Sequence, residues 1–384
     1  MKELIRSIVK DEIYFMPTEV IFGRGALAEI GMLPQVQEKT RVVLVSGGHF
    51  RETEDFKLLI SIFSAQGKEV VVYEPRETKS DFGAINRLVN FLRKEKPDLV
   101  IGVGGGTIID TAKCGTILAV NQGKVEDYVR EKKKELKKKG VTFVAVPTTA
   151  GTGSEVTPWA TVWDTQKKKK YSLTSPLMFP AVAVVDPALT DSLPPKITAE
   201  TGIDALAQAI EAYWSVNHNS VSDKYALEAI GIALGNLEKA VNRPDKKSRD
   251  KMAKAALLAG LAFSNTQTTI CHALSYPMTA YWNIPHGQAV AISLPAFIEY
   301  TLPVLGEREK VLLQVLKTAN EKEAARKVRL LMEKIGLATR LSQLGIKKTD
   351  IDLIVKEGFH SDRAKNAPRI PTSEELREIL EEIL

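Results

Sequence analysis

The sequence is poor in the features of secreted, disulfide-stabilised and membrane-spanning proteins. It has only two cysteines, Cys114 and Cys271, so a disulfide framework and a zinc site built from cysteines are excluded. It has no apolar run of the roughly 20 residues that a membrane-spanning helix needs, and its first residues are too highly charged for a signal peptide. We therefore expect a cytoplasmic protein with no membrane partner.

The sequence also argues against a nucleic-acid partner, although the formal net charge is +6. Much of the positive excess lies in two lysine-rich runs, residues 132–139 and 167–170, and neither run is interleaved with aromatic residues. We expect the first run to be an exposed helix. The second is expected at the tip of a β-hairpin between residues 161–163 and 171–173.

The first half of the chain alternates short apolar strands with helical patterns such as residues 82–96. The expected strands cover residues 19–22, 41–45, 69–73, 98–103, 142–146 and 181–185. Several are continuous runs of Val, Ile and Leu, which are typical of parallel strands buried on both faces. This pattern predicts an α/β fold, with a doubly wound, Rossmann-like parallel sheet over residues 1–186.

The second half shows almost no strand signal. Helical spacing of apolar residues is present over residues 199–215, 222–241, 248–264, 270–280, 289–300, 310–335 and 373–383. With 384 residues the chain is long enough for two domains that each bury a core. We expect residues 187–384 to form an all-helical domain, with a cleft between the two domains.

Two loops rich in Gly, Ser and Thr follow two of the expected strands, one at Gly104–Thr107 and one at Thr148–Ser154. Glycine lets backbone N–H groups approach a phosphate closely, and a helix N-terminus adds positive partial charge. Either loop alone could be a tight turn between strand and helix. Together they predict two walls of one nucleotide site, whose pyrophosphate contacts come from Gly105, Gly106, Thr107, Thr148, Thr149 and Thr152.

A candidate metal site lies in the helical half. Asp204, Gln208 and Glu211 are spaced i, i+4 and i+7, so they share one helix face, and two of only five histidines, His272 and His286, lie close together in sequence. Carboxylate, amide and imidazole ligands suit Fe²⁺ or Zn²⁺. In the alternative interpretation Asp204 caps a local turn and the other residues are ordinary polar side chains.

Several motifs in a fixed order resemble the iron-dependent (group III) alcohol dehydrogenase family over nearly the whole chain. They are Phe22–Ala26, Gly104–Thr107 with Asp110 and Lys113, Pro147–Thr157, Asp186–Pro187, Gly202–Ala205, Pro285–Gly287 and Asn366–Arg369. The resemblance implies a nucleotide-binding domain, a helical metal domain and NAD(P)-dependent interconversion of alcohols and aldehydes or ketones. It also implies cofactor contacts by Asp110, Ser154 and Lys113, although Lys113 could instead be an exposed side chain.

Two positions depart from the family pattern. The family usually holds its metal with one Asp and three His, and Asp204, His272 and His286 match three of these positions, while Gln208 replaces the remaining His. Tyr276 stands where many members have a further His near the nicotinamide, so it is either part of a proton relay or part of the pocket wall. The segments 208–217 and 272–277 resemble the branch associated with phosphonoacetaldehyde reduction.

The cofactor preference is predicted from the turn Ser46-Gly47-Gly48 after the second strand. NAD-preferring relatives tend to carry Asp where this chain has Gly47, and that carboxylate would repel a 2′-phosphate. Because Gly47 has no charge and His49 and Arg51 follow it, we expect NADP(H) to be favoured over NAD(H).

The family resemblance further implies a homodimer or a larger homo-oligomer that acts on a small alcohol or aldehyde. Two other classes of function compete with this interpretation. One is a metal-dependent lyase of the dehydroquinate synthase type, which uses NAD without net oxidation. The other is a nucleotide-binding regulatory protein whose metal site has decayed. Net oxidation or reduction of the nicotinamide by an alcohol or aldehyde separates both from a dehydrogenase.

Overall fold

The computed structural model describes residues 12–130, 133–359 and 362–384 of the chain. Two compact units are present, one formed by Pro17–Leu193 and the other by Pro194–Leu384 together with the N-terminal segment up to Met16. Asp186, the expected end of the first domain, lies inside the first unit, where its carboxylate accepts hydrogen bonds from the backbone N–H groups of Gly25 and Leu27 at 3.0 and 3.1 Å.

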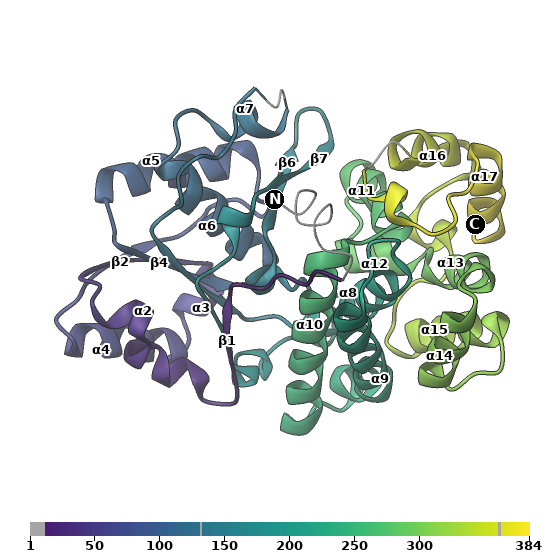
Figure 1. The fold of residues 1–384 in the computed structure, drawn as a ribbon, viewed down its shortest axis with the longest axis horizontal. Coiled ribbons are helices and arrows are strands. Elements are labelled where there is room, and N and C mark those ends of the chain that lie inside the picture. Colours follow the sequence, from purple (N-terminus) through teal and green to yellow (C-terminus); the bar gives the residue numbers. More distant parts are fainter. Residues whose placement is uncertain (1–11, 131–132, 360–361) are drawn as a thin grey trace. The chain divides into compact units, whose positions relative to one another are not determined.

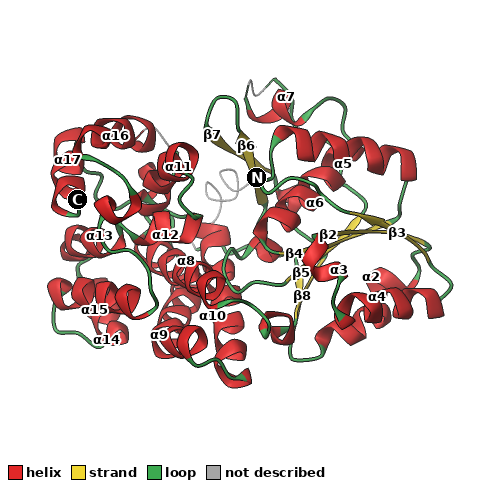
Figure 2. Ribbon diagram, turned by 180° about the vertical axis from the view of Figure 1, so that it is seen from behind, coloured by secondary structure: helices red, strands yellow, loops and turns green. Residues whose placement is uncertain are grey.

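The first unit is built on a six-stranded parallel sheet with the strand order β1-β8-β5-β4-β2-β3 (Figure 2). Its strands are β1 (Glu19–Phe22), β2 (Arg41–Ser46), β3 (Glu69–Tyr73), β4 (Leu99–Gly104), β5 (Thr142–Pro147) and β8 (Val182–Val185). The α-helices of this unit are α2 (Pro34–Gln37), α3 (Gly48–Arg51), α4 (Glu54–Ala65), α5 (Phe82–Glu95), α6 (Gly106–Ala119) and α7 (Val125–Val129). Short 3-10 helices are η1 (Ala26–Met32), η2 (Ser154–Val156), η3 (Pro176–Met178) and η4 (Pro187–Thr190). The predicted strands and their parallel arrangement are confirmed.

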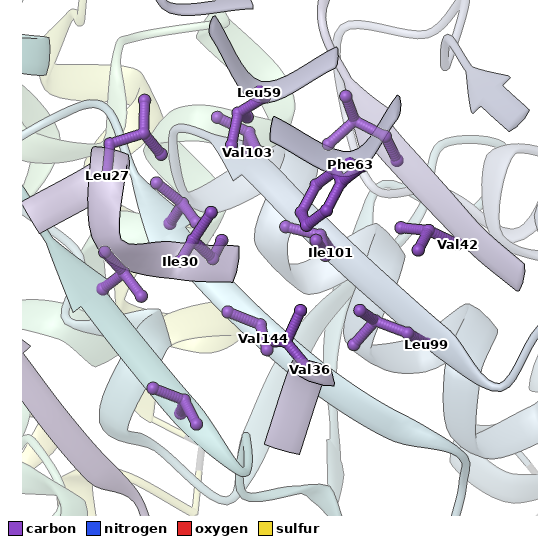
Figure 3. Packing of buried hydrophobic residues seen from close by; sticks show 14 of the residues in the cluster. Leu27, Ile30, Val36, Val42, Leu59, Phe63, Leu99, Ile101, Val103 and Val144 are labelled. Atoms are coloured by element: carbon purple, nitrogen blue, oxygen red, sulfur yellow. The ribbon is translucent and has the colours of Figure 1, made fainter. Parts of the chain in front are cut away.

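Alternate residues of each central strand supply the two cores of this sheet. Val42 and Leu44 of β2 pack in a cluster with Leu59 and Phe63 of α4, which Figure 3 shows from close by. Their neighbours Val43 and Val45 point to the other face and pack in a second cluster, with Leu88 of α5 and Ile109 of α6. Burial on both faces is the reason that these strands read as continuous apolar runs.

The two lysine-rich runs have different structures. Residues 167–170 lie within the expected hairpin, at its turn and at the start of its second strand. The two strands, β6 (Trp159–Asp164) and β7 (Lys169–Thr174), pair antiparallel. The helix expected over residues 132–139 is wrong for residues 133–139, which are not helical, and Lys132 lies outside the described residues. Asn121 accepts hydrogen bonds from the N–H groups of Lys137 and Lys138 at 3.0 and 3.1 Å, which holds the backbone in a non-helical path.

The second unit is helical throughout its described part, as predicted (Figure 1). Its α-helices are α8 (Pro195–Trp214), α9 (Ser220–Asn242), α10 (Lys246–Thr266), α11 (Ile270–Trp282), α12 (His286–Ala291), α13 (Leu294–Thr301), α14 (Glu307–Leu316), α15 (Glu321–Lys334), α16 (Ile351–Phe359) and α17 (Ser373–Glu382). The 3-10 helices are η5 (Leu302–Val304), η6 (Leu341–Leu344), η7 (Lys348–Asp350) and η8 (Ala364–Asn366). Among the described residues, none of these helices has the length and hydrophobicity to span a membrane.

Two of the expected helices are each divided into two. The helix expected over residues 310–335 ends at Lys317, whose φ of 54° is left-handed, and a new helix begins after Asn320, which caps the N–H of Glu323 at 3.0 Å. The helix expected over residues 289–300 is divided between α12 and α13, where Pro295 occupies the first turn of α13. Helical periodicity continues across both breaks, so the sequence pattern alone does not reveal them.

The N-terminal segment belongs to the second unit although the chain then enters the first. The Tyr14 hydroxyl donates to the carbonyl of Leu261 at 3.0 Å, and the N–H of Phe15 donates to Oδ1 of Asn265 at 2.9 Å. Both partners lie in α10. The second unit is therefore discontinuous in sequence.

Candidate functional site

Three of the four predicted metal ligands come together in the helical unit. Asp204 on α8, His272 on α11 and His286 at the start of α12 each offer a ligand atom, and these atoms lie within 4.8 Å of one another. Nε2 of His272 is 3.4 Å from Oδ1 of Asp204, and the centroids of the two imidazole rings are 5.5 Å apart. His286 is the first residue of α12.

Gln208, the fourth predicted ligand, lies beside Asp204 one turn further along α8. Its amide Nε2 donates to Oδ2 of Asp204 at 2.9 Å, which fixes the orientation of the amide. The amide oxygen Oε1 is buried and accepts no hydrogen bond from the part of the chain that the structure describes. An unsatisfied buried acceptor costs about 1–3 kcal/mol, so this oxygen is available to a cation.

Each of the two histidines has a polar partner at Nδ1. Nδ1 of His272 contacts a carboxylate oxygen of Glu211, and Nδ1 of His286 is 3.3 Å from Oγ of Ser275. The Ser275 hydroxyl donates its proton to the carbonyl of His272 at 2.7 Å, so it accepts the hydrogen bond from His286. Partners of this kind are known to fix the tautomer and orientation of metal-binding histidines.

Glu211 is the residue that supports this cluster most directly. Its side chain is fully buried, and its Oε1 accepts hydrogen bonds from the Thr269 hydroxyl at 2.7 Å and from the Cys271 N–H at 2.8 Å. Burial alone would raise the pKa of Glu211, but the charge of His272 and these hydrogen bonds lower it. Glu211 is therefore a buried, charged carboxylate whose oxygens are all engaged in positioning α11.

A close contact between two helices places His286 near Asp204. A Cβ atom on Gly287 would lie 1.8 Å from the carbonyl oxygen of Glu200, so only glycine allows α12 to approach α8 this closely. The sequence signal for this contact was the Pro-His-Gly motif, whose glycine follows a metal-ligand position.

The donor set fits a divalent transition metal. One carboxylate, two imidazole nitrogens and a buried amide oxygen are borderline-to-hard ligands, and the carboxylate of Glu211 contacts one of the imidazoles. Asp204 and Glu211 are both buried at 4% exposure or less, so a cation would also compensate their negative charge.

Tyr276 lies next to the cluster, half-buried on α11. Its ring is nearly parallel to that of His286, with the centroids 6.5 Å apart. Burial raises the pKa of the Tyr276 hydroxyl, whereas the Arg363 guanidinium beside it acts in the opposite direction. Tyr276 thus lies beside His286, and its hydroxyl has a cationic neighbour that the local sequence does not reveal.

The two predicted nucleotide-binding loops face each other at the carboxyl ends of β4 and β5. A Cβ on Gly106 would lie 2.6 Å from Cγ2 of Thr152, and the N–H of Thr148 donates to the carbonyl of Gly104 at 3.0 Å. A cavity of about 410 Å³ opens beside them. Of the predicted cofactor residues, those that line it are Gly47, Gly104, Gly105 and Thr148.

The remaining predicted cofactor residues lie at its edge. Thr107 and Gly106 form the first turn of α6, Thr149 lies against Gly105, and Ser46 and Gly48 lie at the end of β2 and the start of α3. The first turn of α6 has no side-chain cap, which leaves backbone N–H groups for a ligand.

The second loop is held in place by hydrogen bonds that involve Lys113, Asp110 and Ser154. The ammonium of Lys113 contacts three carbonyl oxygens, those of Ser154, Thr157 and Trp159, at 2.6, 3.0 and 2.8 Å. An ammonium has three protons, so these contacts leave none for a phosphate. The alternative of an exposed Lys113 is wrong, because the residue is buried. Asp110 accepts hydrogen bonds from the Ser154 hydroxyl and from the N–H of Thr161.

The turn after β2 contains no acidic residue, but a carboxylate from another part of the chain lies near it. Glu74, directly after β3, forms an ion pair with Arg51, and its Oε1 would lie 2.7 Å from a Cβ on Gly48. The residues that directly follow β2 in the sequence do not include this carboxylate. Because β2 and β3 are neighbours in the sheet, the next strand supplies the carboxylate.

Comparisons with known proteins agree with this geometry. Residues 17–187 match the family described as iron-containing alcohol dehydrogenase, and residues 198–384 match the C-terminal domain of the Fe-containing alcohol dehydrogenase family. The chain is 32% identical over 380 residues to NADPH-dependent butanol dehydrogenase from Clostridium saccharobutylicum, covering 96% of this chain and 97% of that protein. It is 29% identical to NAD-dependent methanol dehydrogenase from Bacillus methanolicus, covering 97% and 99%.

Solved structures give the same result. Sulfoacetaldehyde reductase from Bifidobacterium kashiwanohense in complex with NAD⁺ superposes with a TM-score of 0.91 at 30% identity, over 97% of this chain and 98% of that one. A 1,3-propanediol oxidoreductase superposes with a TM-score of 0.90 at 29% identity, over 97% and 100%. This chain therefore belongs to the iron-containing alcohol dehydrogenase family, and it is an NAD(P)-dependent enzyme that interconverts alcohols with aldehydes or ketones.

Proposed function

We propose that this enzyme uses NADPH to reduce small aldehydes to primary alcohols, with Fe²⁺ or Zn²⁺ held by Asp204, Gln208, His272 and His286. The observation that carries the proposal is the convergence of three ligand atoms within 4.8 Å, supported by the buried carboxylate of Glu211. The reaction consumes the aldehyde, NADPH and one proton, and yields the alcohol and NADP⁺.

We assign the orientation of the reactants to residues of the chain itself. When bound, the metal would polarise the carbonyl and stabilise the negative charge that develops on its oxygen. Glu211 and Ser275 would orient the rings of the two histidines through their Nδ1 atoms, and Tyr276 would form one side of the pocket next to His286. The backbone N–H groups of Gly105 and Gly106 would bind the pyrophosphate of the cofactor.

Preference for NADPH is supported by the lack of a side chain at Gly47, a residue that lines the cavity together with His49. Arg51 supplies a cation at this end, and Glu74 offsets part of its charge. We expect kcat/KM to be higher with NADPH than with NADH, and Gly47→Asp to reverse the order because a carboxylate would repel the 2′-phosphate. Higher efficiency of the unmodified enzyme with NADH would contradict this preference.

Anaerobic reconstitution with Fe²⁺ or with Zn²⁺, followed by an aldehyde screen with both cofactors, tests the proposal. Oxidation of NADPH that depends on both aldehyde and metal supports it. A reaction without net change in the nicotinamide absorbance would favour lyase chemistry of the dehydroquinate synthase type. Cofactor binding without turnover of any aldehyde or alcohol would favour a regulatory protein.

Two further properties belong to the proposal. We infer a cytoplasmic location because both cysteines, Cys114 and Cys271, are buried and unpaired by disulfides. We also infer a homodimer or larger homo-oligomer from the family resemblance. Cell fractionation and light scattering after size-exclusion chromatography test these two points.

A further inference from the structure

We propose that Arg363 is a substrate-specificity residue that binds the anionic end of an aldehyde carrying a carboxylate, sulfonate or phosphonate group. This inference rests on the proposed function, because it assumes that the carbonyl reacts at the metal cluster. It starts from a cation that the fold brings to the cluster from a distant part of the sequence.

The backbone around Arg363 is held firmly against the helices that carry the metal ligands. Arg363 precedes η8, which packs on α11, and its carbonyl accepts the N–H of Asn366 at 3.1 Å. The Asn366 side chain donates to the carbonyl of Thr268 at 3.0 Å and accepts from Nδ2 of Asn217 at 2.9 Å. Through Asn366, the position of Arg363 is fixed to the start of α11 and the end of α8.

A short chain of contacts leads from this arginine to the cluster. The Arg363 guanidinium lies beside the Tyr276 hydroxyl, the Tyr276 ring faces the ring of His286, and His286 shares the cluster with Asp204. Arginine binds carboxylate, sulfonate and phosphonate oxygens with its fixed donor geometry. A substrate whose carbonyl lies at the cluster can thus direct its other end to Arg363.

The arrangement selects by charge. A charged hydrogen bond contributes about 1.5–3 kcal/mol, which corresponds to roughly 10- to 100-fold in affinity. An aldehyde with an alkyl end gains nothing from the guanidinium and leaves it partly desolvated. The enzyme is therefore expected to distinguish anionic from neutral aldehydes through KM more than through kcat.

The test uses pairs of aldehydes that differ in charge: succinic semialdehyde against butanal, and sulfoacetaldehyde and phosphonoacetaldehyde against propanal. With the Fe²⁺-loaded full chain, Arg363→Gln should lower kcat/KM for the anionic compounds by about 10- to 100-fold and leave the neutral ones within threefold. Arg363→Lys should restore part of the loss. Lys365→Gln is the matched control, because it removes an exposed positive charge from the same segment. The iron content should be the same in all variants.

Calorimetric titration of the unreacted protein with butyrate, ethanesulfonate and ethylphosphonate provides a readout that does not depend on turnover. Binding that Arg363→Gln abolishes, and Lys365→Gln leaves unchanged, supports the proposal; the three anions show which oxyanion fits best. Equal kcat/KM for charged and neutral aldehydes, or equal effects of Arg363→Gln on both, overturns the role of Arg363 while leaving the proposed function intact. If no aldehyde reacts, the proposed function fails, and the anion titrations then decide on Arg363 alone.

Discussion

The two regions to which we assign cofactor binding and metal binding are built by opposite means. The nucleotide-binding loops work through missing side chains: Gly105 lines the cavity, and a Cβ at Gly106 would collide with Thr152. The metal cluster works through buried polar side chains, of which Glu211 is fully enclosed. One site depends on backbone that a ligand can reach, and the other on charges that must be compensated.

This difference determines how each region tolerates change. In the loops, any added side chain occupies the space of the ligand, so the effect is steric. In the cluster, a replacement of similar shape fits, but it alters the charge and donor pattern on which metal affinity depends. The following substitutions test that distinction.

The largest effect is expected for Gly105→Val. A Cβ at Gly105 lies 3.4 Å from Cγ2 of Thr149, so the two added methyl groups of valine fill the space between the facing loops. We expect the Kd for NADPH and NADH to rise more than 100-fold in a calorimetric titration. Gly235→Val, at an exposed position with no atom within 4 Å of the added Cβ, should leave both values unchanged. Tight binding by the first variant would place the pyrophosphate elsewhere.

Glu211→Gln is expected to weaken metal binding without a change in side-chain volume. The amide lacks the negative charge that contacts Nδ1 of His272, and loss of such a partner typically costs 10- to 100-fold in affinity. Titration of the metal-free protein with Fe²⁺ under anaerobic conditions measures it. Glu228→Gln, which changes an exposed carboxylate on α9, is the control. Equal affinities in the two variants would show that Glu211 serves stability alone.

A smaller effect concerns stability against pH at Glu155, a buried residue of the second loop. Burial raises the pKa of Glu155 from 4.5 to about 7, although its own backbone N–H and Lys113 act against this shift. Between these values the folded protein holds a proton that the unfolded chain has released, so the free energy of unfolding falls as pH rises. Glu155→Gln should remove this loss and raise stability at pH 8 by about 1–3 kcal/mol relative to the parent. Denaturant unfolding of both proteins between pH 5 and pH 8 measures this difference. If the free energy of unfolding depended on pH in the same way in both, the Glu155 carboxyl would already be ionised at pH 5, and this prediction would be wrong.

The smallest effect is expected for Gln208→His. The amide oxygen of Gln208 is a neutral donor, and an imidazole at this position should bind Fe²⁺ or Zn²⁺ about three- to tenfold more tightly. Competition with a chelator gives the ratio of affinities. An unchanged ratio would indicate that Gln208 only orients Asp204 through its 2.9 Å hydrogen bond.

The same contrast explains what the sequence could predict. Strand positions depend on a local property, the apolar run, and they were predicted correctly. The glycine loops are also visible in the local sequence, and their role as a nucleotide site stays a prediction. The spacing of Asp204, Gln208 and Glu211 also placed Glu211 on the correct helix face, but its partner His272 lies 61 residues away and only the fold shows that they meet.

Other features depend on contacts that leave no local pattern. Glu74 approaches Gly48 from a neighbouring strand, and Arg363 approaches Tyr276 from a separate segment near the end of the chain. The predicted helix over residues 133–139 failed because Asn121, distant in sequence, binds the backbone N–H groups. The periodicity of apolar residues cannot predict where a helix ends, or what structure a lysine run adopts, when a single distant residue determines it.

The early segment that docks on α10 has a consequence for biosynthesis. Tyr14 and Phe15 are translated about 250 residues before their partners Leu261 and Asn265. At about 5–20 residues per second, the segment waits roughly 12–50 s for its binding surface. The helical unit therefore cannot be completed until the sheet unit has been translated, because residues 17–193 lie in the sequence between the N-terminal segment and the helix on which it docks.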